Sequence, residues 1–260
     1  MIMPDTTHAI FSLQSSTMWH DYFSRNAASL LPIPWNCSYR LSKSEYAAVI
    51  GSIQEFQLGE SSEGKHLYHA AQRYADRIGD PAYVRAIAAF IREEQRHAGD
   101  LNRFLVSQQA PTITISWVDV IFRGLRRGTN LELALSVLVT AEIIAKVYYA
   151  AVYVATQSPM LRTLCKQILH DEAAHVQFHI ERLAQIRIDR PGLIHRGILI
   201  LHRLLFYGAC TVVWSKHSQV FLSIGMNFST YAQQCWREFA AALRGLQQAT
   251  EAIRVSQSEA

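Results

Sequence analysis

Ile91-Arg-Glu-Glu-Gln-Arg-His97 and His170-Asp-Glu-Ala-Ala-His175 carry the same pattern in two distant parts of the chain. Each contains Glu-x-x-His directly preceded by a further acidic residue. The acid, the glutamate and the histidine are Glu93, Glu94 and His97 in the first stretch, and Asp171, Glu172 and His175 in the second. Positions i and i+3 of an α-helix share one face, so each motif presents a carboxylate and an imidazole to the same point. Two such helices facing each other predict a metal site, provided that neighbouring helices each add a carboxylate.

Apolar periodicity and capping residues predict four long helices around these motifs. Their predicted ranges are 42–78, 81–107, 131–156 and 159–190. Each range follows or begins with a residue suited to cap a helix, and proline follows the cap in the second and fourth. The caps are Ser42, Asp80, Thr129 or Asn130, and Ser158. The same order occurs two times along the chain: a helix with one core glutamate is followed by a helix with Glu-x-x-His. This repetition predicts two antiparallel pairs of helices related by a pseudo-twofold axis.

Carboxylates occupy positions on the apolar stripes of these helices. Glu60 lies on the stripe of the first helix, and Glu142 and Lys146 are the interior charges of the otherwise apolar third. A buried carboxylate needs a partner, yet the stripes carry no matching set of Lys or Arg. Any one of these residues alone would be explained as a solvated glutamate or a core histidine, but the repetition favours two divalent cations, iron or manganese. The predicted ligands are Glu60, Glu94, His97, Glu142, Glu172 and His175.

We expect residues 1–260 to form a single domain. Residues 1–41 lack clear periodicity and predict an arm with short helical pieces, laid on a bundle formed by residues 42–190. A short helix is expected around 117–125. Residues 191–250 predict additional packing helices, one or two of them within 192–225 and a last one over about 229–250. An amphipathic face for a partner or a membrane surface is the alternative for 192–225.

Composition argues against several classes of protein. The 25 basic and 21 acidic residues give a net charge of +4 without a basic run, so no nucleic-acid partner is expected. The four cysteines are far apart, which favours a reducing cytoplasm over a disulfide framework. The N-terminus lacks the pattern of a signal peptide, and the uncharged run Leu204–Ser215 is too short to span a bilayer. We therefore expect a cytoplasmic protein that is not transmembrane.

The order and spacing of the motifs resemble the ferritin-like di-iron carboxylate superfamily, which includes rubrerythrins, ribonucleotide reductase small subunits and bacterial multicomponent monooxygenases. The resemblance covers about residues 42–190, with 34 residues from Glu60 to Glu94 and 30 from Glu142 to Glu172. It implies an all-α fold: an antiparallel four-helix bundle with extra C-terminal helices and an N-terminal arm. Gly59-Glu60-Ser61 resembles the first ligand segment of rubrerythrins, which favours Glu60 as the ligand, and Glu63 one turn away is the alternative.

The resemblance also implies residues that orient the ligands. In monooxygenase-type members the acid before each motif serves the opposite histidine, so Asp171 would orient His97 and Glu93 would orient His175. The alternative is that both acids are charges at the edge of the core. His179, one turn after His175, is either a third histidine ligand or a hydrogen-bonded core histidine.

Two positions depart from the superfamily. Leu101 stands where ribonucleotide reductase subunits carry a radical tyrosine, which argues against a tyrosyl-radical subunit. Lys146 stands where monooxygenases carry a pocket threonine. It is a candidate pocket residue that would pair with Glu142 or bind an anionic substrate, and an ordinary ion pair elsewhere is the alternative.

The resemblance implies an oxidoreductase with two iron ions, or a manganese and an iron, that activates O2. The extra apolar helices after Pro191 favour a di-iron oxidase or monooxygenase acting on a small, mainly apolar organic substrate. Without rubredoxin-like cysteines, electrons would come from a separate reductase or ferredoxin, and a homodimer is a candidate assembly. The alternatives are a ferroxidase or peroxide-scavenging protein of the ferritin or rubrerythrin type, and a metal-free structural module.

Overall fold

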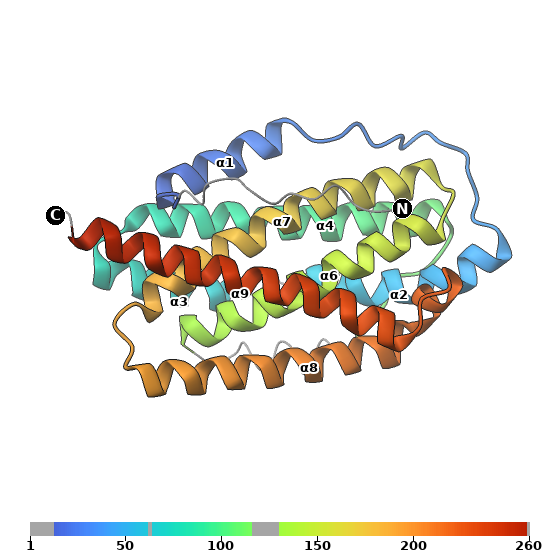
Figure 1. Cartoon of the computed structure of the whole chain (residues 1–260). Helices are drawn as coiled ribbons and strands as arrows, with labels where there is room; N and C mark the ends of the chain where they lie inside the picture. Colours follow the sequence, from blue (N-terminus) through green and yellow to red (C-terminus); the bar gives the residue numbers. More distant parts are fainter. Residues whose placement is uncertain (1–12, 62–63, 116–129, 259–260) are drawn as a thin grey trace.

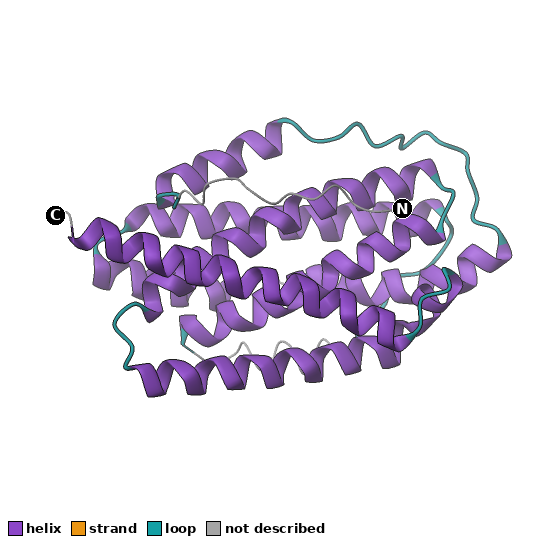
Figure 2. Ribbon diagram, viewed as in Figure 1, coloured by secondary structure: helices purple, strands orange, loops and turns teal. Residues whose placement is uncertain are grey.

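The structure is a computed structural model that describes residues 13–61, 64–115 and 130–258. Every regular element within these ranges is an α-helix (Figure 2), so the predicted all-α class is confirmed. The helices are α1 (Ser16–Ala28), α2 (Lys43–Glu60), α3 (Lys65–Ile78), α4 (Pro81–Ser107), α6 (Leu131–Ala155), α7 (Pro159–Arg187), α8 (Gly192–Ser223) and α9 (Phe228–Ser258). The helix expected around 117–125 falls outside the described residues.

The starts of the long helices follow the predicted caps. Ser42 and Glu45 form a capping box at α2, in which each side chain pairs with the other's backbone N–H. Asp80, Asn130 and Ser158 accept a hydrogen bond from a backbone N–H in the first turn of α4, α6 and α7. These four positions fix where the metal motifs fall along their helices.

The first long helix was predicted to run to about Ile78, and this prediction is wrong. The chain instead forms α2 and then α3, with Gly64 as the residue before α3 in the left-handed conformation at φ +65°. A Cβ at Gly64 would lie 2.7 Å from side-chain atoms of Ile91 on α4. Only glycine allows this backbone shape and this close approach together.

Helices α2, α4, α6 and α7 close a ring, because α2 packs on α4, α4 on α7, α7 on α6 and α6 on α2. The other helices cover this ring: α3 packs on α4, α8 on α6 and α2, and α9 on α7 and α6. The arm helix α1 lies along α4, on the side of the molecule opposite α8 (Figure 1). Residues 29–42 then run without regular structure to α2 (Figure 2).

Within the part of the chain that the structure describes, two helices are long and apolar enough to cross a membrane by length and composition alone. The apolar window of α6 is 83% buried within the protein, as expected of a core helix, whereas that of α8 is only 28% buried. The region 192–225 therefore contains one helix that exposes large apolar side chains, among them Leu193, Ile200 and Leu204. Two such helices are weak evidence about a membrane, because core helices of soluble proteins meet the same criteria.

Candidate metal centre

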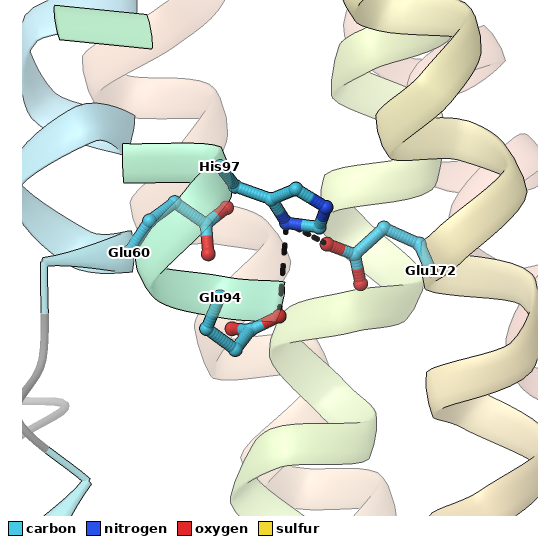
Figure 3. Close-up of side chains that lie close together, drawn as sticks. All are labelled: Glu60, Glu94, His97 and Glu172. Atoms are coloured by element: carbon cyan, nitrogen blue, oxygen red, sulfur yellow. Dashed lines mark ion pairs between the residues drawn. The ribbon is translucent and has the colours of Figure 1, made fainter. Parts of the chain in front are cut away.

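The structure brings the six predicted ligands together from four helices. Glu60 comes from α2, Glu94 and His97 from α4, Glu142 from α6, and Glu172 and His175 from α7. Ligand atoms of four of them lie within 4.8 Å of one another, and so do those of a second group that shares Glu172. The groups are Glu60, Glu94, His97 and Glu172, and Glu142, Glu172 and His175. Figure 3 shows the first group converging on one point between the helices. These buried Glu and His residues could hold a metal ion.

Two glutamates lie between the two histidines. Glu94 Oε1 is 3.8 Å from Nδ1 of His97 and 3.2 Å from Nδ1 of His175. Glu172 is placed alike, with one oxygen 3.8 Å from Nδ1 of His97 and the other 3.6 Å from Nδ1 of His175. Both carboxylates would therefore be able to contribute ligand atoms beside either imidazole.

Several of these ligand atoms are buried without a hydrogen-bond partner among the described residues. They are Nδ1 of His97 and His175, Oε1 of Glu94, Oε2 of Glu172 and both carboxylate oxygens of Glu142. Buried polar atoms normally have partners, and each exception calls for an explanation such as an ion. Six unpartnered ligand atoms in one place fit a cation-binding centre.

The opposite nitrogen of each histidine is held by an acid from the facing helix. His97 Nε2 lies 3.0 Å from Asp171 Oδ2, and His175 Nε2 lies 2.9 Å from Glu93 Oε2. Because a carboxylate accepts hydrogen bonds, these contacts place the proton on Nε2 and direct the Nδ1 lone pair into the centre. These are the two crossed pairs that the resemblance implies.

Asn26 joins both supporting acids and was not found from the sequence. Its side-chain NH2 group donates to Glu93 Oε1 at 2.5 Å and to Asp171 Oδ1 at 2.7 Å. Asn26 is buried near the end of α1, in an arm whose sequence carries no motif. Nothing in its sequence surroundings signals this role, because only the docking of α1 on α4 brings it to the acids.

Asp171 receives further support from two residues outside the predicted set. Arg96 Nη2 and Gln167 Nε2 both donate to its carboxylate. Burial alone would raise the pKa of Asp171, but the hydrogen bond from His97 and the charge of Arg96 hold this pKa well below its usual range. Asp171 is therefore a fixed anion behind His97. Arg96 could have been suspected from the sequence, since it lies inside the first motif.

The protein groups of the centre also shift one another's protonation. Burial raises the pKa of Glu60 and, with the charge of Glu94 adding to it, raises that of Glu172 to about 7. Burial alone would raise the pKa of Glu94 too, but contact with His175 lowers it to about 2. Burial opposes a charge on His175, yet its closeness to the Glu172 carboxylate and its hydrogen bond to Glu93 raise its pKa well above the usual range. Bound cations would displace these shared protons.

The remaining candidates have other surroundings. His179 Nε2 lies 3.1 Å from Glu142 Oε1, so His179 contacts a predicted ligand but belongs to neither group of converging atoms. Tyr149 donates its hydroxyl to Glu60 at 3.2 Å. Lys146 forms an ion pair with Glu238 of α9 and is not among the residues that line the cavity beside the centre. Glu63, the alternative to Glu60, lies outside the described residues.

A cavity of about 140 Å³ adjoins the centre. Glu60, Glu94, Glu142 and Glu172 form one part of its wall, and apolar side chains of α2, α6 and α8 form much of the rest. These apolar residues include Phe56, Leu138 and Val213. The centre therefore faces a small and largely apolar space.

No protein-family model matches the chain, and no curated protein or solved structure matches it either. The residues and their geometry therefore carry the functional assignment.

Proposed function

We propose that the protein is a ferritin-like di-iron oxidoreductase that uses O2 to oxidise or oxygenate a small, mainly apolar organic molecule. The observation that carries this proposal is a set of unpartnered carboxylate and imidazole atoms next to an apolar cavity. The ring of α2, α4, α6 and α7 supports the ferritin-like part of the proposal, because that fold builds its metal site from facing helices of a four-helix bundle.

The donor set fits two divalent cations that share ligands. Glu60, Glu94, His97 and Glu172 would hold one, and Glu142, Glu172 and His175 would hold the other, with Glu94 next to both histidines. Carboxylate and imidazole donors suit iron, and a manganese–iron pair has the same requirements. A pair of reduced iron ions supplies electrons for the reduction of O2.

The chain itself orients the donors and shapes the reaction space. Asp171 and Glu93 fix the two imidazoles, and Asn26 fixes these two acids relative to each other. The apolar wall of the cavity favours an apolar molecule beside the centre. We further propose a cytoplasmic protein that takes electrons from a separate reductase or ferredoxin.

The alternative of a ferroxidase or peroxide-scavenging protein makes a different demand on the site. Such a protein needs a polar route for hydrated iron or peroxide and has no use for an organic pocket. Phe56, Leu138 and Val213 in the cavity wall favour the organic substrate.

Iron binding by the full-length protein tests the proposal. Under anaerobic conditions we expect about two Fe(II) per chain, and we expect Glu172→Ala to abolish stoichiometric binding because Glu172 belongs to both groups. Glu181→Gln is the matched control, since Glu181 is also a buried acid of α7 but accepts hydrogen bonds from Trp19 and Gln177. Unchanged iron content in Glu172→Ala would refute the dimetal centre. Admission of O2 to the iron-loaded protein should then consume O2, and a protein that holds iron without reacting would refute the oxidase.

A further inference from the structure

The cavity beside the centre has a second polar feature, which is His217 on α8. This side chain is 3% exposed and lines the cavity together with the four glutamate ligands. Its Nδ1 lies 2.7 Å from Ser52 Oγ, and its ring packs edge-on against Phe56 and Tyr148 at 5.1 and 5.8 Å between centroids. Contacts from α2 and α6 thus hold the imidazole in one orientation.

The second ring nitrogen of His217 remains available. The only hydrogen bond to this imidazole within the described ranges involves Nδ1, which leaves Nε2 as its other polar atom. Burial, with the charge of Lys216 adding to it, lowers the pKa of His217 to about 4, so the ring is uncharged near neutral pH. A buried neutral imidazole at the wall of an apolar cavity offers a hydrogen bond to whatever occupies that cavity.

The cavity sets limits on its occupant. An apolar cavity of about 150 Å³ accommodates a benzene molecule, so a volume of about 140 Å³ suits a single six-membered ring. The described lining includes five glutamates and no Lys or Arg. They are Glu55, Glu60, Glu94, Glu142 and Glu172. Two cations would balance the four ligands, and Glu55 would still disfavour an anion. Lys146, which could have attracted one, pairs with Glu238.

We propose that His217 anchors the substrate, an uncharged molecule of about one six-membered ring that carries a hydroxyl or carbonyl group bound by Nε2. The ring of this molecule lies against the apolar wall, between the anchor and the carboxylates of the centre. This inference rests on the proposed function for the statement that the bound molecule is a substrate. The binding itself can be measured without turnover.

Ser52 decides which polar group suits the anchor. If its hydroxyl donates to Nδ1, then Nε2 carries the proton and binds an alcohol or a ketone. If its hydroxyl accepts from Nδ1, then Nε2 is an acceptor and binds an alcohol but not a ketone. A comparison of cyclohexanol with cyclohexanone therefore reports the tautomer of His217.

Calorimetric titration of the full-length, iron-loaded protein with cyclohexanol and cyclohexane, without O2, tests the anchor. We expect His217→Leu to weaken cyclohexanol binding about tenfold, which is the effect of one lost buried hydrogen bond, and to leave cyclohexane binding unchanged. His217→Gln keeps a polar group at the site and should recover most of the affinity. His202→Leu is the matched control, because His202 is also a buried histidine of α8 but contacts Thr140 and does not line the cavity.

Three results would overturn the anchor. They are equal cyclohexanol affinity in the wild type and His217→Leu, an equal loss in His202→Leu, and no binding of either ring compound by the wild type. If His217→Leu does not fold, His217→Phe, which also lacks a polar group, replaces it in the same comparison, and a cyclohexanol affinity equal to that of the wild type contradicts the anchor. A chain that binds cyclohexanol through His217 but holds no iron would refute the proposed function and keep the anchor. A chain that binds two iron ions but neither ring compound would refute the anchor and keep the dimetal centre of the proposed function.

Discussion

At the scale of single residues, Asn26 ties the arm to the centre. One amide group bridges Glu93 and Asp171, and these two acids orient the two histidines. The six ligands are predicted from the sequence because helical spacing repeats a recognisable motif, and the two supporting acids are implied by the resemblance to monooxygenase-type proteins. The sequence does not predict Asn26 or His217, since each reaches the site from a helix without a motif and only tertiary packing places it there.

Replacing Asn26 should therefore weaken metal binding without removing a ligand. In Asn26→Leu the two acids lose their shared donor, and we expect iron affinity to fall by about 10- to 100-fold, as is usual when a group that supports a ligand is lost. Competition with a chelator under anaerobic conditions measures this change, and a melting curve checks that the variant folds. Asn102→Ala, an exposed asparagine on α4, should bind iron like the wild type. The same iron affinity in Asn26→Leu and the wild type would show that the bridge has no effect on the metals.

At the scale of helices, the caps could be predicted and the break between α2 and α3 could not. Gly51 and Gly59 lie inside α2, whereas Gly64 lies at the break. All three weaken helix propensity alike. Gly64 differs from the other two because the side chain of Ile91, on α4, lies close to it. A close approach between two helices cannot be predicted from the residues around Gly64 alone.

This contact gives a matched pair of substitutions. Gly64 and Gly79 both have positive φ, but a Cβ at Gly79 would meet no atom within 4 Å. We expect Gly79→Ala to lower the free energy of unfolding by about 1–2 kcal/mol, the cost of a left-handed non-glycine residue. Gly64→Ala should cost more because of the clash with Ile91. Denaturant unfolding of both variants measures the difference. Equal losses in the free energy of unfolding would show that the Ile91 side chain moves aside at little cost.

At the scale of the whole molecule, the crowded carboxylates make stability depend on pH. Glu172 has its pKa raised to about 7 and His175 has its pKa raised, so above pH 6.5 the folded metal-free protein binds more protons than the unfolded chain. Stability must then fall as pH rises. Burial lowers the pKa of His202 and His217 to about 4, which acts in the opposite direction, but that contribution is almost complete by about pH 7.5, one unit above the ordinary pKa of histidine.

We therefore expect the melting temperature of the metal-free protein to decrease from pH 6.5 to 8. Two equivalents of Zn(II), which is redox-inert, should raise the melting temperature more at pH 8 than at pH 6.5, because the cations replace the protons that are lost. In Glu172→Gln the decrease should be smaller. Scanning calorimetry provides the measurement, and a melting temperature of the metal-free protein that increases over this range would contradict the shared-proton description.

The position of α1 makes the N-terminal arm a part of the candidate metal centre. The ring lies within residues 43–187, but the acids behind its histidines share a donor, Asn26, from the preceding segment, which lies along α4 (Figure 1). Residues 29–42, which run without regular structure from α1 to α2, connect this part of the site to the ring. A chain without residues 1–28 would keep all six predicted ligands but lose the amide group that joins Glu93 to Asp171.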